Sequence, residues 1–358
     1  IATLFASKIA QKISHWTGKF WLYLISALGF FVLWFIYLKL SQLAIFAGAD
    51  LFPDDAPLYL KPDWLDFSQG TVLAGYGLAL AGLILYSLFF VDINKTSLHN
   101  YYRDRLSKAY LFDRTEEDGK KTLRHNDEQL LSKLDTECAP YHLINAALNI
   151  PSSKEMNRRG RDADFFIFSK RYVGSELTGY CKTKNLEAVD GHLDLGTAMA
   201  ISGAAAAPNM GRVTVKPLVF MMAMLNIRLG YWLPNPKRIV PIGMMDRAWK
   251  QMARVGPMYL IREMIGDIDE NSWNVNLSDG GHIENLGIYE LLRRRCKFII
   301  ASDAESDPEL KFGGLAHLMR LALIDMGIKI ELNLDPIRKK KSGLSQTHFV
   351  KGTIDYGN

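Results

Sequence analysis

The sequence contains little cysteine. Cys138, Cys181 and Cys296 are the only three among 358 residues, and no two of them are spaced as C-x-x-C. An odd number of cysteines without paired spacing argues against a disulfide framework and against a zinc site. Reduced thiols are typical of proteins that fold in the cytosol. We therefore expect free, mostly buried thiols.

Common ligand-binding motifs are also missing. The chain has neither a phosphate-binding P-loop nor a dinucleotide G-x-G-x-x-G, and its eight histidines show no H-x-x-x-H pair with a nearby acid. The formal net charge of +5 is small for this length and does not indicate a nucleic-acid-binding protein. We predict no metal, no organic cofactor and no nucleic-acid partner.

Charged residues are absent from two long stretches near the N-terminus, 20–38 and 71–91. About 20 residues of helix cover the roughly 30 Å hydrocarbon core of a bilayer. The first stretch extends to about residue 46 if Lys39 reaches the interface with its long side chain. The sequence therefore predicts a membrane hairpin over 1–95, with spans at about 20–46 and 71–91.

The charges beside these stretches predict an orientation. Basic residues lie before the first stretch and after the second, whereas the loop 48–70 between them is acidic. Positive charge near the ends of a span favours the cytoplasmic side. The residues before the first stretch do not have the pattern of a signal peptide, so we expect none there. We therefore predict an integral protein of the inner or plasma membrane, with its soluble domain in the cytoplasm.

The remaining residues, 96–358, read as one soluble domain in which strand-like and helix-like patterns alternate. Strands are predicted at 141–150, 163–168, 273–277, 297–303 and 328–334, and helices at 196–207, 216–233, 285–296 and 314–326. Helices that alternate with strands favour an α/β layer fold with a largely parallel sheet.

The segment 277–291 combines an aspartate with two glycines at the end of a predicted strand. Asp279 is followed by Gly280 and Gly281. Two glycines allow a sharp turn and the close approach of another chain segment or a substrate. An aspartate at the carboxyl end of a strand lies where α/β enzymes place groups that face the ligand. A simple turn would give the same pattern.

Asp279-Gly280-Gly281, followed by Asn285, resembles the D-G-G segment of the patatin-like phospholipases. The small residues of 198–211 are similar to a helix that lies between the two catalytic residues in that family. Four further segments resemble its membrane-bound bacterial members: 101–112, 163–180, 225–233 and 293–295. The resemblance covers roughly 96–335. It implies part of a patatin-like three-layer α/β domain with a mainly parallel sheet, preceded by the two-helix transmembrane hairpin.

What the resemblance implies is lipid acyl hydrolysis by a serine–aspartate dyad. In such enzymes a serine in G-x-S-x-G attacks the ester, the aspartate acts as base, and a glycine-rich loop stabilises the oxyanion. Asp279 corresponds to the catalytic aspartate, while Gly280, Gly281 and Asn285 form the surrounding loop. The implied partners are a membrane phospholipid or other acyl lipid as substrate, and the lipid bilayer.

The chain departs from this family pattern in two respects. No serine has glycine at both −2 and +2, and the glycine-rich oxyanion loop is missing. The nucleophile therefore lies N-terminal to Ile1, or on a separate chain, or has been lost in a non-catalytic membrane-anchored scaffold or binding subunit. Acyl transfer would need the same dyad in a site that excludes water. Ser202, His282 and Asp303 are weaker site candidates, for which structural roles are favoured.

Overall fold

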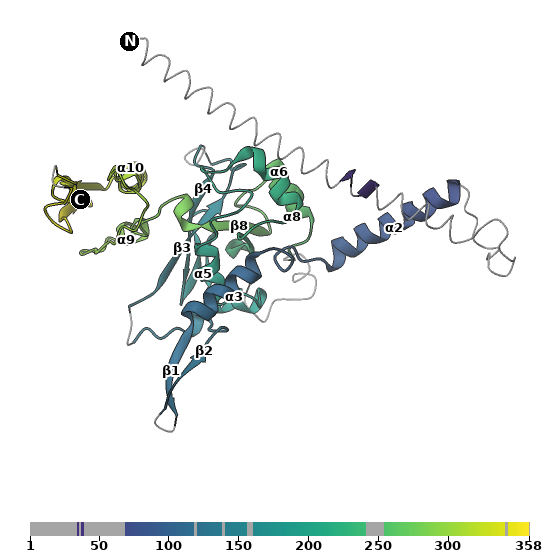
Figure 1. The fold of residues 1–358 in the computed structure, drawn as a ribbon, viewed down its shortest axis with the longest axis horizontal. Helices are drawn as coiled ribbons and strands as arrows, with labels where there is room; N and C mark the ends of the chain where they lie inside the picture. The colour runs from purple at the N-terminus through teal and green to yellow at the C-terminus, as the bar shows by residue number, and fades with distance from the viewer. Residues whose placement is uncertain are drawn as a thin grey trace, which may run out of the picture.

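The computed structural model describes residues 34–35, 37–38, 69–117, 120–137, 140–155, 160–240, 254–340 and 343–357. Within these ranges the α-helices are α2 (Gln69–Phe90), α3 (His99–Tyr110), α4 (Thr183–Val189), α5 (Leu195–Ser202), α6 (Lys216–Met224), α8 (Met258–Ile265), α9 (Tyr289–Arg293) and α10 (Gly313–Met326). The strands are β1 (Phe112–Glu117), β2 (Lys120–His125), β3 (Leu143–Asn149), β4 (Ala163–Ser169), β5 (Tyr172–Ser175), β6 (Gly179–Lys182), β7 (Tyr231–Pro234), β8 (Asn274–Asp279), β9 (Lys329–Leu332) and β10 (Gly352–Asp355). Helix α2 and the β1–β2 hairpin project from the rest of the molecule (Figure 1).

A six-stranded sheet with the order β6-β5-β4-β3-β8-β7 forms the centre of the molecule. Every pair of neighbouring strands in it is antiparallel. The elements described between β3 and β6 include no helix, and only Lys170 and Arg171 separate β4 from β5. Strands joined this directly pair antiparallel, whereas parallel strands need a crossover of about a dozen residues or more. The predicted patatin-like three-layer domain with a mainly parallel sheet is therefore wrong.

Helix α5 packs closely against both the sheet and α3. It contacts β3 and β8, and Ala198 is fully buried there. A Cβ atom at Gly196 would lie 2.4 Å from the Ser107 hydroxyl of α3, so the two helices approach each other where glycine leaves room. Asp194 caps α5 by accepting the N–H of Thr197 at 2.7 Å. The small residues of this segment are thus explained by close packing.

No helix in the described part of the chain is long and apolar enough to cross a membrane. A span needs about 20 apolar residues. The first predicted span, 20–46, lies almost wholly outside the described residues. The second, 71–91, falls on α2. The finding overturns the predicted transmembrane hairpin and the predicted integral location in the inner or plasma membrane with a cytoplasmic domain.

Three predicted helices are shorter than expected, and one of them, over 285–296, is reduced to α9. The small-residue helix over 196–207 ends at Ser202. The apolar run 216–233 divides into α6 and strand β7. Asn226, between these two elements, has a φ of 52°. The right-handed helix does not allow this φ, so the chain turns there and returns as a strand.

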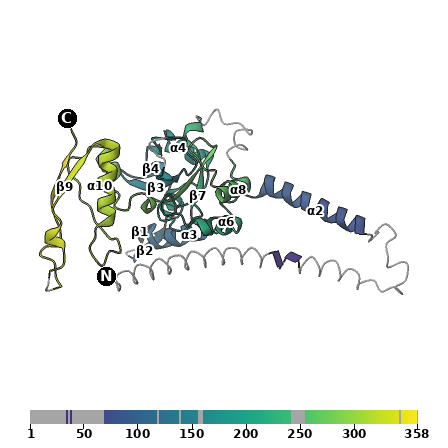
Figure 2. The same cartoon turned by 90° about the horizontal axis from the view of Figure 1, so that it is seen from above.

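The chain after the sheet forms a second packing unit. We call residues 284–357 the C-terminal region and the described residues of 91–283 the sheet body. In the C-terminal region α9, α10 and the antiparallel β9–β10 hairpin pack around their own apolar cluster, at the end of the molecule opposite α2 (Figures 1 and 2). The predicted strand 297–303 is wrong, because the segment has no regular structure and leaves Phe298 81% and Ile300 83% exposed.

Four of the residues that join the two regions form one cluster, which we call the clasp. Phe165 of β4 stacks on Tyr289 of α9 with the ring centroids 3.6 Å apart. Arg161 donates two hydrogen bonds to the carboxylate of Asp325 in α10. The Tyr289 hydroxyl donates to the same carboxylate at 2.9 Å. The clasp therefore combines ring stacking with a bidentate ion pair, the strongest common geometry for such a pair.

Candidate functional site

Asp279 is the last residue of β8, at the point where that strand leaves the sheet. Its backbone N–H donates to the carbonyl of Ala204, in the loop after α5, and it pairs with Ala146 of β3. The half-buried side chain accepts the N–H of Gly281 at 2.8 Å through Oδ1. In the described part of the chain Oδ2 accepts no hydrogen bond. One carboxylate oxygen is thus held by the backbone, and the other is left without a hydrogen bond from the described residues.

The two glycines after Asp279 leave room for other parts of the chain. A Cβ atom at Gly280 would lie 2.9 Å from the backbone carbonyl oxygen of Asn145 in β3. A Cβ atom at Gly281 would lie 2.7 Å from the Oδ1 atom of Asn285. Both distances are shorter than van der Waals contact, so larger residues would push these neighbours away.

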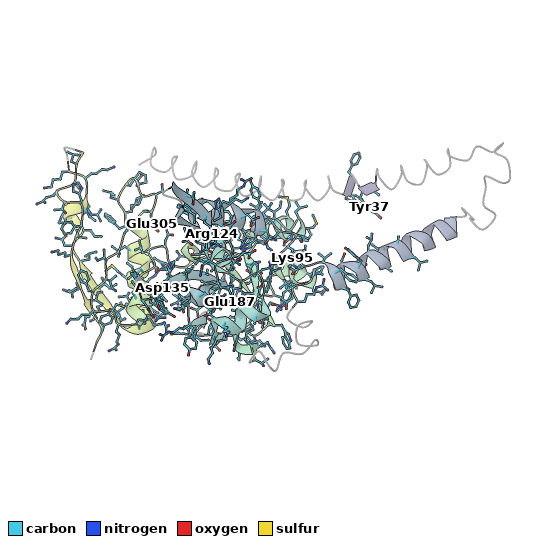
Figure 3. The ribbon with its side chains drawn as sticks, turned by 90° about the horizontal axis from the view of Figure 1, so that it is seen from below. Tyr37, Lys95, Arg124, Asp135, Glu187 and Glu305 are labelled. Atoms are coloured by element: carbon cyan, nitrogen blue, oxygen red, sulfur yellow. The ribbon has the colours of Figure 1, made fainter. Side chains whose placement is uncertain are left out.

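Asn285 lies beside the aspartate turn. Its Oδ1 atom is next to Gly281, and its Nδ2 atom donates to Glu305 at 2.9 Å. Glu305, labelled in Figure 3, lies in the segment that leads to α10. The structure therefore brings all four predicted site residues together, because Gly280 and Gly281 link Asp279 to the loop that carries Asn285.

Tyr102 of α3 is a neighbour that the sequence does not reveal. Its hydroxyl donates to the carbonyl of Gly203 at 2.9 Å. Burial raises the pKa of the Tyr102 phenol, and the negative charge of Asp279 raises it further. The phenol therefore stays neutral at physiological pH and keeps its proton as a donor. A helical pattern alone does not predict that this residue reaches the end of β8.

A serine–histidine pair lies directly behind Asp279. The Oγ atom of Ser278 is 2.9 Å from Nδ1 of His282. Burial lowers the pKa of His282, although the charge of Asp279 and a hydrogen bond with the backbone of Ala205 oppose the shift. Ser278 is fully buried, so its hydroxyl cannot meet a substrate. The pair holds the turn against the loop after α5.

A buried polar network extends from Ser278 across the neighbouring strands. Asn149 of β3 donates to Ser278 at 3.1 Å and to Asn276 at 2.8 Å. Asn276 in turn donates to the Glu263 carboxylate of α8 at 3.0 Å, and that carboxylate also pairs with Arg228. Buried polar groups need such partners to avoid a desolvation penalty. The network therefore connects β8, the strand that ends in Asp279, to helix α8.

Glu284 organises the loop after the turn. Its buried carboxylate accepts the backbone N–H groups of four successive residues, Leu286, Gly287, Ile288 and Tyr289. Orphan N–H groups at the start of a helix favour a negative charge. Glu284 therefore fixes the loop that carries Asn285 and leads into α9. A glutamate shortly before a predicted helix is the sequence signal that could have identified it.

The described residues do not supply a nucleophile for Asp279. Ser202 is the last residue of α5, so the anion-binding advantage of a helix N-terminus does not apply to it. Burial raises the pKa of the Cys181 thiol to about 12, which keeps it protonated and unreactive. Asp303 is exposed and accepts the N–H of Glu305 at 2.9 Å, as a local turn does. Within the described residues no group of three or more His, Cys, Asp or Glu side chains is arranged to hold a metal ion.

Comparison with known proteins identifies no relative of this chain. No family model matches the chain, and no curated protein and no solved structure matches it either.

Proposed function

We propose that this chain supplies the aspartate base of a serine–aspartate dyad that hydrolyses acyl lipids such as phospholipids. The serine would come from a segment that these 358 residues do not contain, either N-terminal to them or on a separate chain. The observation that carries the proposal is the position of Asp279. It ends a central strand, its Oδ1 is held by Gly281, and its Oδ2 accepts no hydrogen bond in the described part of the chain.

The proposed step needs only one proton acceptor from this chain. As the serine oxygen attacks the acyl carbon, its proton moves to Oδ2 of Asp279, and it then passes to the leaving alcohol oxygen. A water molecule releases the acyl group in the same way, with Asp279 again taking and returning a proton. The hydrogen bond from Gly281 to Oδ1 orients the carboxylate during both steps.

The surroundings of Asp279 support this chemistry in two ways. Gly280 and Gly281 make the turn narrow, so a segment bearing a serine could approach closely. The neutral hydroxyl of Tyr102 provides a polar group near the carboxylate without neutralising its charge. The proposal concerns this local chemistry, because the antiparallel sheet differs from the sheet that the resemblance implies.

A second candidate is a non-catalytic scaffold or binding subunit. The absence of any G-x-S-x-G in the sequence favours it. In this case Asp279 would stabilise the turn through its hydrogen bond to Gly281 and would have no proton to transfer.

Fluorophosphonate labelling of the protein purified from its native source separates the two candidates. The hydrolase proposal predicts a labelled serine in a peptide that is absent from these 358 residues. It also predicts that Asp279→Asn lowers ester hydrolysis about 100-fold or more, since general bases contribute at least this much. Asp303→Asn is the matched control and should retain activity within about twofold. Unchanged hydrolysis in Asp279→Asn would refute the site, and no label on the folded protein would favour the scaffold.

A further inference from the structure

A hollow of about 470 Å³ lies beside the turn between β4 and β5. Three tyrosines and two arginines line much of it: Tyr141, Tyr172, Tyr180, Arg171 and Arg294. None of the residues around it belongs to the Asp279 site. The volume is within the range of about 300–1,000 Å³ that is typical of small-molecule sites.

Hydrogen bonds hold the turn that forms one wall. The Tyr141 hydroxyl donates to the Ser169 hydroxyl at 2.9 Å and accepts the backbone N–H of Arg171 at 3.1 Å. Ser169 in turn donates to the carbonyl of Tyr172 at 2.6 Å. The Tyr141 hydroxyl and the backbone of Arg171 and Tyr172 are therefore held together before any ligand arrives.

The opposite wall comes from the end of α9. Arg294 donates through Nε to the Glu290 carboxylate at 2.8 Å, and Arg293 donates twice to the same carboxylate. One negative charge is thus shared between two guanidinium groups. The Arg294 side chain remains 43% exposed, so its other N–H groups are available to the hollow.

The balance of charge around the hollow is positive. Arg171 has no ion-pair or hydrogen-bond partner for its side chain in the described part of the chain. Lys170 donates to Thr136, which lines the hollow, and no carboxylate is among the lining residues. Glu290 pairs with both Arg293 and Arg294, and Glu176 pairs with Arg293. Asp135 and Glu137 flank the lining residue Thr136 in the sequence. The lining residues therefore offer an anion two arginines and no carboxylate.

The tyrosines indicate which chemical group an anionic ligand would carry besides its negative charge. Tyr141, Tyr172 and Tyr180 are 38%, 51% and 44% exposed, so part of each ring faces solvent. Bases of nucleotides stack on such rings, and each stack contributes about 1–3 kcal/mol. Arginine binds phosphate through paired N–H groups.

We propose that this hollow binds a nucleoside phosphate, with the phosphate on Arg171 and Arg294 and the base against the tyrosine rings. The site goes beyond the proposed hydrolysis, because it shares no residue with the Asp279 turn. Its occupant would be a regulatory or second ligand of the protein.

Calorimetric titration of the full-length protein tests this proposal. The probes are the four ribonucleoside 5′-monophosphates, adenosine and inorganic phosphate. At least one monophosphate should bind about tenfold or more tightly than either adenosine or inorganic phosphate, because only the monophosphates engage both halves of the site. Absence of binding by all four monophosphates, or equal binding of inorganic phosphate, would overturn the proposal.

Variants locate the binding. Arg171→Ala should lower the affinity for the monophosphate about tenfold or more, because a charged donor is lost. Tyr172→Leu should lower this affinity several-fold. Arg124→Ala removes an exposed arginine on β2 that does not line the hollow, and it should leave the affinity unchanged. Equal unfolding temperatures would show that the variants are folded. Unchanged affinity in folded Arg171→Ala would refute the site.

Discussion

The sheet body and the C-terminal region contain similar apolar sequences but bury them very differently. Leu148, Phe166 and Leu277 of the central strands are fully buried. Phe298 and Ile300, from an equally apolar run, are more than four-fifths exposed. The difference lies in the backbone, since β3 and β8 each have strands on both sides, whereas the described strands do not adjoin 297–303. An apolar run becomes a core strand only where another strand can complete its hydrogen bonds.

The sheet body also differs in its buried charge. Glu263 accepts hydrogen bonds from Arg228, Trp232 and Asn276, and the ion pair with Arg228 is 1% exposed on both sides. The ion pair of the clasp is more open, with side-chain exposures of 17% and 10%. Removal of one member of a fully buried pair leaves the other charge without compensation. The stability of the sheet body should therefore depend on this pair.

The largest effect is expected from breaking this buried pair. Glu263→Ala should lower the free energy of unfolding by about 3–5 kcal/mol, because Arg228 would stay buried without its partner. Urea unfolding followed by tryptophan fluorescence measures the change, and Asp267→Ala is the control. Asp267 pairs with Arg262 on the surface of the same helix region, so its loss should cost less than about 1 kcal/mol. Equal losses in both variants would contradict the distinction.

A pair of truncations tests the comparison of the two regions directly. Leu277→Ala should lower the free energy of unfolding by about 2–5 kcal/mol, because it leaves a cavity in the main core. Ile300→Ala should change stability by no more than about 0.5 kcal/mol, because the side chain already faces solvent. Denaturant unfolding of both variants measures the difference. A comparable loss in Ile300→Ala would mean that this segment is paired in the intact protein.

A smaller effect concerns pH and the buried imidazole of the sheet body. His99 donates through Nδ1 to the Leu229 carbonyl at 2.6 Å, and burial lowers its pKa from 6.5 to about 4. The unfolded chain therefore binds this proton more readily, so stability falls as the pH drops from about 6.5 to 4. Wild type should lose about 2 kcal/mol more than His99→Gln between pH 7 and pH 5. Parallel pH profiles of the two proteins would show that His99 is not the titrating group.

Three strands of the central sheet, β3, β4 and β8, could be predicted from apolar patterns, whereas β5, β6 and β7 were not predicted as strands. The predictions over 163–168 and 328–334 are confirmed by β4 and β9, and the helix over 314–326 by α10 with Gly327 as its left-handed cap. Strand direction could not be predicted in this way. It depends on whether consecutive strands are joined by a turn or by a packed helix. The division of 216–233 at Asn226 shortened one expected helix and added strand β7.

The candidate site was only partly predictable. Asp279 could be placed at a strand end because the apolar pattern stops there and two glycines follow. Tyr102, which comes from a helix far away in the sequence, is brought near by tertiary packing that a local pattern does not encode. His282 was noted as a loop residue, but its contact with Ser278 depends on the turn geometry.

The carboxylate of Glu284, which holds four successive backbone N–H groups, has a consequence for affinity. A loop that must become ordered when its ligand arrives loses conformational entropy at that moment, roughly 1–2 kcal/mol for each residue fixed. Here the loop carrying Asn285 is ordered during folding, by a side chain of the chain itself. Any molecule that docks beside Asp279 meets a surface already in its final shape, so its contact energy contributes to affinity without this loss.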